Sequence, residues 1–384
     1  MLKIDNLPFY WRLAKDTSNN IVPSNMEFVF DWDEKLSLLK QKRNSNTLEA
    51  LHIIYQQEDN IGYLQEVNTI ARSYGTDFLI FLKKELKKII PEGANILEIG
   101  CGGCVLLEEL KNDGHRVLGI DSSPFAVSEG KKRGIRVIND FFPSPKITES
   151  FDLIFCVDVL EHIDDYTSFI NEQISWLNPN GLIVVNVPDA TESISIGDIS
   201  LAMHQHLNYF TAKSLNALLK QSGLVNINIE ASNYGGSLYA CGKKTIQDKD
   251  IDNTLADAKG NSTKELDLYE KKSEKNISKL RSHISNMTKL KKSIGFYVPL
   301  RALPYLCSLT DINFRFFDDT PHWYGKKFDG VDIEIENMND LIADPVDVLY
   351  IMSLTFGKTI KTKILSSIDR PIEINLLEDF CHFD

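Results

Sequence analysis

The stretch over residues 94–121 constrains the fold of this chain more than any other. It opens with a short apolar run, Asn95 to Ile99, which predicts a buried parallel strand. Three glycines follow closely and predict a tight turn: Gly100, Gly102 and Gly103. A helix is expected to begin at Val105, and a second apolar run, Arg116 to Ile120, ends at Asp121. The pattern predicts a strand, a glycine loop, a helix and a second strand ending in an acid, a common unit for binding a ligand that carries adenosine.

An acid, Glu98, precedes the glycines by two residues. A carboxylate there would repel a pyrophosphate, but it suits a ligand with an ammonium and a sulfonium group. With Asp121 placed to hold ribose hydroxyls, the set resembles motif I of class I S-adenosylmethionine-dependent methyltransferases, whose common form is acid-x-Gly-x-Gly-x-Gly. Cys104 holds the third glycine position, and Gly103 is expected to supply the flexibility. The resemblance implies a doubly wound, Rossmann-like α/β domain with S-adenosylmethionine as its cofactor. These residues would bind it: Glu98, Gly100, Gly102, Gly103 and Asp121.

Two later acids are also predicted to bind the cofactor. Asp140 follows a short strand, Ile135 to Ile138, at the place where an adenine ring would lie. Its carboxylate could accept a hydrogen bond from the adenine amino group, and the alternative is that it caps a turn. Asp158 ends the apolar strand Leu153 to Val157, and such strand ends form the ligand crevice in doubly wound sheets.

The residues after that strand, Val159 to Ile163, resemble the corresponding segment of the same methyltransferase class. The resemblance implies a structural role near the cofactor for His162. Asp158 and Glu161 do not have the spacing of a divalent-metal cluster, because the next two acids lie a turn further along. No metal site is therefore predicted.

The segment Met203 to Thr211 reads MHQHLNYFT and follows the last strand of the predicted crevice. In this fold the connection usually lies over the methyl group, and histidine is a natural general base because its usual pKa is about 6.5. We predict His206 as the catalytic base and His204 as a second candidate. The alternative is that both histidines bond backbone groups and shape the loop.

This segment also resembles the His-Glu-His-x-x-Tyr-Phe segment of sugar C-methyltransferases, which act on nucleotide-linked keto-deoxysugars. The histidine proposed as the base in that family corresponds to His206. A tyrosine of the family corresponds to Met203, and Gln205 replaces the glutamate between the two histidines. The resemblance implies an enzyme that transfers a methyl group to a nucleotide-linked sugar or glycan precursor. One alternative is an O- or C-methyltransferase of another small-molecule natural product. A non-catalytic binding protein that keeps the fold is the other.

The chain is expected to contain four consecutive parts. A mainly helical cap is predicted for residues 1–90, and the cofactor-binding domain is predicted for residues 91–245. Residues 246–292 are rich in charge and predict one long amphipathic helix, with a self-pairing coiled coil as the alternative. Residues 293–384 alternate apolar runs with helical segments, which predicts a second, smaller α/β domain. It resembles the C-terminal Rossmann-like domain of the sugar C-methyltransferases, whose N-terminal zinc module is not expected here because no cysteine precedes Cys101.

Composition narrows the possible partners. A net charge of −12 over 384 residues argues against a nucleic-acid surface, and no apolar run is long enough to cross a bilayer. We expect a cytoplasmic monomer or homodimer that binds a small molecule, with neither nucleic acid nor membrane as partner. Cys101 and Cys104 form a C-x-x-C pair, which alone suggests redox chemistry or half a zinc site. Within a glycine loop, however, a small side chain is the main requirement.

Overall fold

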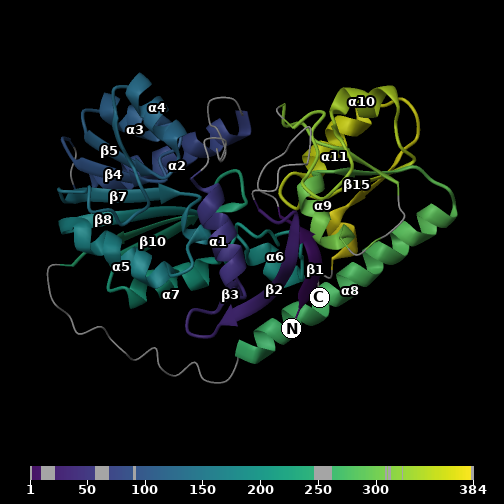
Figure 1. Ribbon diagram of the computed structural model, residues 1–384, viewed down its shortest axis with the longest axis horizontal. Coiled ribbons are helices and arrows are strands. Elements are labelled where there is room, and N and C mark those ends of the chain that lie inside the picture. Colours follow the sequence, from purple (N-terminus) through teal and green to yellow (C-terminus); the bar gives the residue numbers. More distant parts are fainter. Residues whose placement is uncertain are drawn as a thin grey trace. The chain divides into compact units, whose positions relative to one another are not determined.

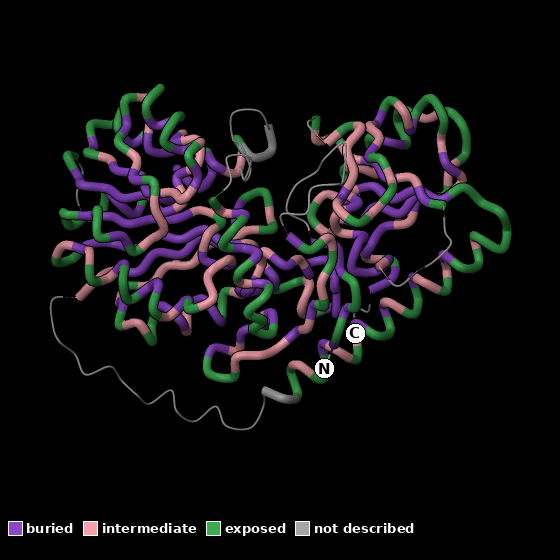
Figure 2. Tube along the Cα trace, viewed as in Figure 1, coloured by how far each residue is buried: buried purple, intermediate pink, exposed green. Residues whose placement is uncertain are grey.

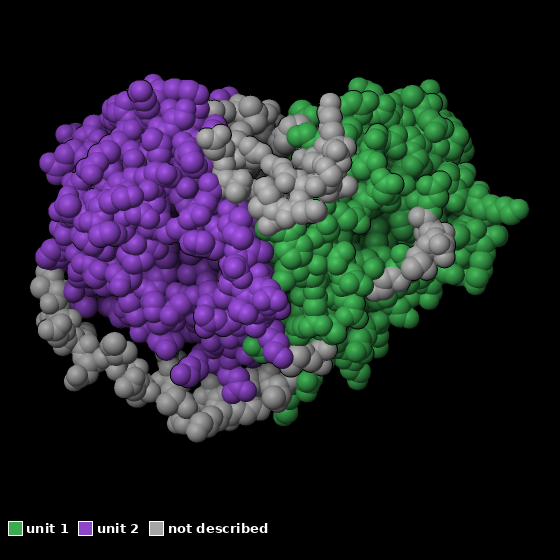
Figure 3. All heavy atoms as spheres, viewed as in Figure 1, with its two compact units in different colours: residues 1–31, 191–206, 263–384 green, residues 32–190, 207–262 purple. Residues whose placement is uncertain are grey.

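The computed structural model describes most of the chain (Figure 1), over residues 2–9, 22–56, 69–89, 92–245, 262–307, 309, 313–321 and 323–381. These residues fall into two compact units, which are coloured separately in Figure 3. Unit 1 contains residues 1–31, 191–206 and 263–384, and unit 2 contains residues 32–190 and 207–262. Each unit is therefore assembled from segments that are far apart in the sequence.

Unit 2 is built on a seven-stranded sheet with the strand order β10-β11-β8-β7-β4-β5-β6. The strands are β4 (Asn95–Ile99), β5 (Arg116–Asp121), β6 (Arg136–Asn139), β7 (Phe151–Val157), β8 (Leu177–Pro188), β10 (Val225–Ala231) and β11 (Ser237–Lys243). Strands β4 to β8 pair in parallel, whereas β11 pairs antiparallel with both β8 and β10. The strand order reverses between β4 and β7, so the carboxyl ends of these two strands flank a crevice where ligands bind in such sheets.

Helices cover both faces of this sheet. They are α1 (Ser45–Ile54), α2 (Thr69–Lys87), α3 (Val105–Asn112), α4 (Pro124–Lys132), η1 (Leu160–His162), α5 (Tyr166–Trp176) and α7 (Ala212–Gln221). Alternate residues of β4 point to opposite faces, so Leu97 joins one apolar cluster with α5 and α7, and Ile96 joins another with α2 and α3. Figure 2 shows the resulting pattern, in which the strands are mostly buried. The predicted doubly wound α/β fold is confirmed.

Two short strands complete unit 2. They are β3 (Leu38–Gln41) and β9 (Asn208–Tyr209), which pair antiparallel. Within the part of the chain that the structure describes, no helix has the length and apolar character needed to cross a membrane.

Unit 1 contains a second parallel sheet, with the strand order β14-β13-β12-β15-β16. Its strands are β12 (Ile294–Tyr297), β13 (Phe314–Phe317), β14 (Ile335–Glu336), β15 (Val348–Ile351) and β16 (Glu373–Leu376). Its helices are α9 (Pro299–Leu306), α10 (Met338–Ala343), α11 (Gly357–Leu365) and η3 (Leu377–Phe380). The predicted second α/β region at the C-terminus is confirmed.

The N-terminal region differs from its prediction. A mainly helical cap over residues 1–90 is wrong for the first part, which forms β1 (Lys3–Pro8), β2 (Asn25–Asp33) and β3. Strands β1 and β2 pair antiparallel within unit 1. Phe28 and Phe30 are fully buried, and this period of two is the strand signal in the sequence. The helical spacing further along is confirmed by α1 and α2.

Two more helices belong to unit 1, α6 (Thr191–Ile196) and α8 (Ser262–Lys289). Helix α8 confirms the predicted long helix over most of residues 246–292, of which residues 246–261 lie outside the described part. Its buried side chains are Tyr269, Ser273, Asn276, Leu280 and Ile284. Asn276 Nδ2 donates to the carbonyl oxygens of Ile196 and Gly197 at 2.8 and 2.9 Å. This face of α8 thus packs within unit 1, which argues against the coiled-coil alternative.

The two units do not follow the predicted domain boundaries after residues 90, 245 and 292. Residues 191–206 leave the sheet of unit 2 and belong to unit 1, together with residues 1–31. Local periodicity identifies helices and strands, but it does not reveal which distant segments pack together.

Candidate functional site

The glycine loop follows β4 and folds back onto the end of β5. The Gly100 N–H donates to the Ile120 carbonyl at 2.8 Å, and the Gly102 N–H donates to Asp121 Oδ2 at 2.9 Å. Gly100 has φ +73°, and a Cβ there would lie 2.6 Å from Cγ2 of Val159. Glycine is therefore required at position 100 by both backbone conformation and space.

Cys104 ends the loop in the left-handed conformation, with φ 58° and ψ 21°. In this loop Cys104 has a positive φ and Gly103 does not. The prediction that Gly103 supplies the flexibility of the loop is therefore wrong. The Cys104 side chain is fully buried, and its Sγ lies 3.8 Å from Cys101 Sγ. The hydrogen bond with Cys104, together with burial, raises the pKa of the Cys101 thiol. A buried neutral thiol is poorly reactive, so these contacts favour a packing role.

Glu98 lies in β4 immediately before the loop, and its side chain is only 4% exposed. Its Oε2 has no hydrogen-bond partner within the described part of the chain. Burial raises the pKa of Glu98 well above the usual value, and the nearby Asp121 carboxylate adds to the effect. A buried oxygen without a partner is costly, and it indicates a place where a ligand brings a donor or a cation.

Asp121 is fixed by two backbone donors. Ser123 N–H donates to Oδ1 at 2.8 Å, and Gly102 N–H donates to Oδ2. Burial raises the pKa of Asp121, and the two hydrogen bonds oppose the rise. Each carboxylate oxygen can accept a further hydrogen bond, so the hydroxyls of a bound ribose are suitable partners.

Asp140 is occupied by groups of its own turn. Its Oδ2 accepts from Ser144 Oγ at 2.8 Å and pairs with Lys146 Nζ at 3.1 Å, and its Oδ1 accepts from Phe141 N–H. The hydrogen bond from Ser144, followed by the one from Lys146, lowers the pKa of Asp140. These contacts fit the turn-capping alternative, and adenine binding by Asp140 stays a prediction.

Asp158 directly follows β7 and has a left-handed backbone with φ 53°. Its side chain reaches solvent, yet loss of hydration raises its pKa to about 6. Its N–H donates to the Asn186 carbonyl in β8 at 3.1 Å, which ties the ends of β7 and β8 together. Asp158 thus lies at the predicted crevice, and its role in cofactor binding stays a prediction.

Two buried groups that were not predicted lie close to these strand ends. Asn186, near the carboxyl end of β8, is 3% exposed, and its Oδ1 lacks a partner among the described residues. Glu161, in η1, is 1% exposed and both of its carboxylate oxygens lack one. The sequence shows the acid at position 161, but its complete burial depends on tertiary packing.

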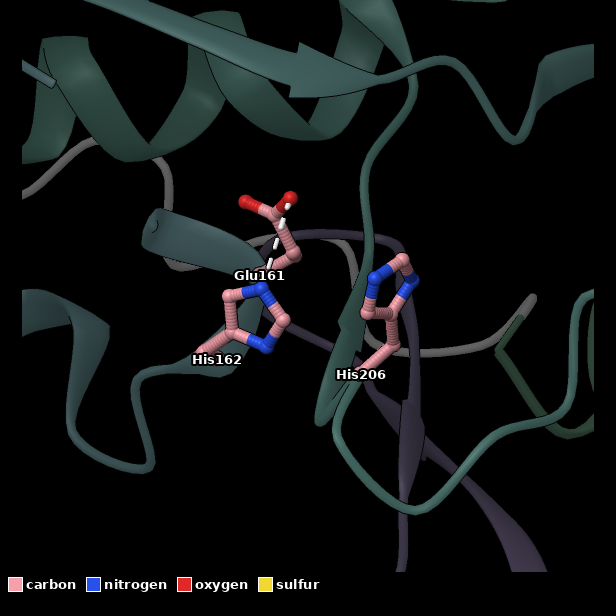
Figure 4. A group of neighbouring side chains, drawn as sticks. All are labelled: Glu161, His162 and His206. Carbon is pink, nitrogen blue, oxygen red and sulfur yellow. Dashed lines mark ion pairs between the residues drawn. The ribbon is translucent and has the colours of Figure 1, made fainter. Parts of the chain in front are cut away.

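His162 connects Glu161 to α1. Its Nε2 lies 3.9 Å from Glu161 Oε1, an ion pair drawn as a dashed line in Figure 4, and its Nδ1 lies 3.1 Å from Tyr55 Oη. The Tyr55 carbonyl accepts from Ser122 Oγ at 2.7 Å, next to Asp121. Burial and the charge of Glu161 raise the pKa of Tyr55, so its hydroxyl stays neutral.

His204 is fully buried in unit 1 and stacks on Phe9, with ring centroids 5.1 Å apart. Its Nε2 lies 3.3 Å from the Leu7 carbonyl, and burial lowers its pKa to about 4. A buried, neutral imidazole bonded to a backbone carbonyl cannot reach a substrate, so the prediction of a catalytic His204 is corrected to a structural role.

His206 is half-buried and ends the segment 191–206 of unit 1, where its N–H donates to the Met203 carbonyl at 3.1 Å. The next residue, Leu207, belongs to unit 2, and its N–H donates to the Glu161 carbonyl at 2.7 Å. The role of His206 as a base stays a prediction.

Residues 72–229 match a protein family described as a methyltransferase domain. The chain is 30% identical over 121 residues to the mitochondrial ubiquinone biosynthesis O-methyltransferase of Schizosaccharomyces pombe, an overlap of 29% of this chain and 44% of that protein. The enzyme of the same name from Azorhizobium caulinodans is 29% identical over 138 residues, covering 34% of this chain and 51% of the relative. The chain thus spans about half the length of these curated relatives.

Solved structures give weaker likenesses. N-methyltransferase NodS of Bradyrhizobium japonicum, in complex with S-adenosyl-L-homocysteine, aligns with a TM-score of 0.38 and 19% identity, over 52% of this chain and 99% of that one. Magnesium protoporphyrin IX methyltransferase of Synechocystis, with bound SAM, aligns with a TM-score of 0.36 and 14% identity, over 48% and 86%. The family match confirms the prediction of a methyltransferase domain around the glycine loop.

Proposed function

We propose that this chain, whose residues 72–229 form a methyltransferase domain, transfers a methyl group from S-adenosylmethionine to a hydroxyl oxygen of a small molecule. The observation that carries the proposal is Glu98, whose buried carboxylate has an oxygen without a partner directly before a glycine loop. The ammonium group of S-adenosylmethionine would supply the missing partner. The curated relatives named as O-methyltransferases support oxygen as the acceptor atom.

The residues of the loop fit this cofactor. Glu98 would hold the ammonium group, and the backbone around Gly100 and Gly102 would lie against the methionine part. Asp121, already oriented by the Gly102 and Ser123 amides, would bind the ribose hydroxyls. The bound cofactor would supply an electrophilic methyl group, so the protein mainly has to position the acceptor in line.

Proton removal needs a second group. His206 stays the predicted acceptor of the hydroxyl proton, at a ring nitrogen, because an imidazole titrates near neutral pH. His204 is no longer a candidate, since it is buried and neutral.

A nucleotide-linked sugar is a second candidate acceptor. The observation that favours it is the parallel five-stranded sheet of unit 1, which the sugar C-methyltransferase resemblance predicts for residues 293–384. The curated O-methyltransferase relatives favour a different small molecule, so we rank the sugar second. A cytoplasmic location, and a monomeric or homodimeric state, stay predictions.

A labelled donor tests the proposal. The protein would be incubated with S-adenosylmethionine that carries a deuterated methyl group. One incubation would also contain a catechol-type phenol, and a second would contain a nucleotide-linked keto sugar instead. We expect mass spectrometry to find the label on the phenol oxygen. Label on the sugar would reverse the ranking, and binding of the donor without transfer to any acceptor in a cell extract would contradict the enzyme proposal.

A further inference from the structure

Asn186 is a buried polar group of unit 2 that the proposed cofactor contacts do not use. It is only 3% exposed, and its Oδ1 has no hydrogen-bond partner in the part of the chain that the structure describes. Leaving a buried amide oxygen unpaired costs free energy, so such an atom indicates a place where a ligand brings a hydrogen-bond donor. The ammonium group of the methyl donor is assigned to Glu98, so Asn186 needs a different partner.

The strand register places Asn186 beside the glycine loop. Glu98 in β4 lies opposite Phe155 in β7, and Phe155 lies opposite Val184 in β8. Two residues further along each parallel strand, Gly100 is level with Asn186, and the Glu98 and Asn186 side chains share one face of the sheet. Neighbouring strands are about 4.8 Å apart, so Asn186 lies about 10 Å across the sheet from the start of the loop. A small acceptor molecule fits into this span beside the methyl donor.

The next strand carries a buried hydrogen-bond network on the same face. Tyr239 in β11 lies opposite Asn186, and its hydroxyl donates to Asp77 Oδ2 at 3.0 Å. Asp77, on α2, is buried, and its Oδ2 also accepts from Ser232 Oγ at 3.0 Å and from the Asn233 N–H at 2.9 Å. The turn between β10 and β11 is therefore fixed next to Asn186.

This turn presents Tyr234 at the edge of the sheet where β8 ends. The Asp189 N–H, directly after β8, donates to the Gly236 carbonyl at 3.0 Å. The Tyr74 hydroxyl on α2 donates to the Gly235 carbonyl at 2.7 Å, and the centroids of the Tyr74 and Tyr234 rings are 5.5 Å apart. Tyr234 is nevertheless 50% exposed. An exposed aromatic ring on a turn that is held in place is suited to stacking on a planar ring of a ligand.

We propose that Asn186 and Tyr234 form the acceptor site of unit 2 and select an aromatic diol with adjacent hydroxyls. Tyr234 would stack on the ring, and Asn186 Oδ1 would accept a hydrogen bond from one hydroxyl. An amide oxygen is a hydrogen-bond acceptor and not a base, so the hydroxyl at Asn186 keeps its proton and the adjacent hydroxyl receives the methyl group. There the O–C bond forms, the C–S bond of the donor breaks and the hydroxyl proton passes to a general base. This assignment deepens the proposed function and rests on it for the chemistry of the acceptor.

The test measures acceptor binding without turnover. Catechol and its saturated counterpart, cis-cyclohexane-1,2-diol, would be titrated by calorimetry into the whole chain in the presence of S-adenosyl-L-homocysteine. We expect the parent to bind catechol about tenfold more tightly than the saturated diol, and Tyr234→Ala to lose most of that preference, because stacking needs a planar partner. Tyr234→Phe keeps the ring and should bind as the parent does.

Tyr324→Ala is the matched control, because it removes a tyrosine of unit 1 that is 53% exposed, and catechol binding should not change. A parent that does not bind catechol overturns the acceptor site. A parent without preference for catechol, or an unchanged preference in Tyr234→Ala, overturns the role of Tyr234.

Asn186→Leu tests the hydrogen bond separately. Leucine has a similar shape but no acceptor, so we expect catechol to bind about fivefold more weakly, the effect of one net hydrogen bond. The thermal unfolding midpoint should not fall, because the change removes a buried amide oxygen that has no partner in the described part of the chain. Unchanged catechol binding in Asn186→Leu overturns the role of Asn186.

Methyl transfer separates this site from the proposed function. A protein that binds catechol through these two residues but transfers no methyl group from S-adenosylmethionine refutes the proposed function alone. A protein that methylates catechol, with parental affinity for it in both Tyr234→Ala and Asn186→Leu, refutes the acceptor site alone.

Discussion

The parallel strands of the two large sheets share one order. In unit 2 the five parallel strands follow the order β6-β5-β4-β7-β8, and in unit 1 the order is β14-β13-β12-β15-β16. In each sheet the strand order therefore reverses beside the first strand. The residue after the first strand bonds the second strand in both: Gly100 N–H donates to Ile120, and Val298 N–H donates to Phe317 at 3.1 Å. Topology alone therefore gives each sheet a possible ligand crevice.

The residues at the two crevices differ. In unit 2, glycines follow β4, and the acid Glu98 has an oxygen without a partner among the described residues. The Asp121 carboxylate accepts hydrogen bonds from backbone N–H groups. In unit 1, Val298 takes the left-handed conformation with φ 61°, and Pro299 begins α9 without an N–H to donate. We therefore expect the chemistry of the loop, and not the strand order, to decide which sheet binds the cofactor.

The largest effect is expected from Glu98→Gln. Losing the carboxylate charge should weaken S-adenosylmethionine binding about 100-fold, since a hydrogen bond to a charged group contributes about 1.5–3 kcal/mol. Calorimetry checks this, with Glu109→Gln on the exposed side of α3 as the matched control. If both variants bind S-adenosylmethionine equally well, Glu98 does not distinguish the crevice of unit 2 from that of unit 1.

Gly100→Ala should be nearly as damaging to the loop. A left-handed alanine costs about 1–2 kcal/mol, and contact with Val159 adds to it, so we expect unfolding to be easier by about 2–3 kcal/mol. Gly114→Ala isolates the backbone cost, because Gly114 has φ +88° and open space around its would-be Cβ. If denaturant unfolding gives the same loss of unfolding free energy for both variants, the contact with Val159 does not destabilise the protein.

The units should also respond differently to acid. His204 in unit 1 has its pKa lowered from 6.5 to about 4, so the unfolded chain binds the proton first and stability falls as pH drops from 6.5 towards 4. The loss between pH 7 and pH 5 should be about 2 kcal/mol and should shrink in His204→Gln, which keeps a donor but does not titrate. The raised pKa values of Glu98 and Asp121 in unit 2 act in the opposite sense, because they favour the folded state at low pH.

Urea unfolding at pH 7 and pH 5 measures this response. A parent protein that is equally stable at both pH values, with His204→Gln no different, would contradict the buried neutral histidine.

Cys104→Gly should have the smallest effect. Glycine relieves the left-handed strain by about 1 kcal/mol, but it also removes a buried thiol, so the two changes nearly cancel. We expect a stability change below about 1 kcal/mol and donor affinity within threefold of the parent. A large loss of affinity would mean that the thiol does more than fill space beside Cys101.

Much of the sheet framework could be predicted from the sequence. The buried strands β4, β5, β7 and β12 are short apolar runs between turn residues, and such runs need no knowledge of the rest of the fold. The first three strands were missed because helical spacing further along was extended over residues 1–41. The assignment of residues 191–206 to unit 1 has no local signal at all.

The site was predictable in part for a similar reason. Glu98, the glycines and Asp121 lie close together in sequence, so their strand register places them correctly. His204 was misjudged because burial decides its role. The stacking of His204 on Phe9 and the burial of Glu161 leave no mark in the sequence, where both residues look like any other polar residue.

S-adenosylmethionine is expected to bind at the glycine loop of unit 2. Asp121 and Asp318 offer a matched test, since each follows or ends the second strand of its sheet and each accepts the N–H two residues further on, at 2.8 and 2.9 Å. Calorimetric titration should give one equivalent of bound donor in the parent, at least tenfold weaker binding in Asp121→Asn, and unchanged binding in Asp318→Asn. No binding to the parent, or loss of binding in Asp318→Asn with Asp121→Asn unaffected, would contradict the account.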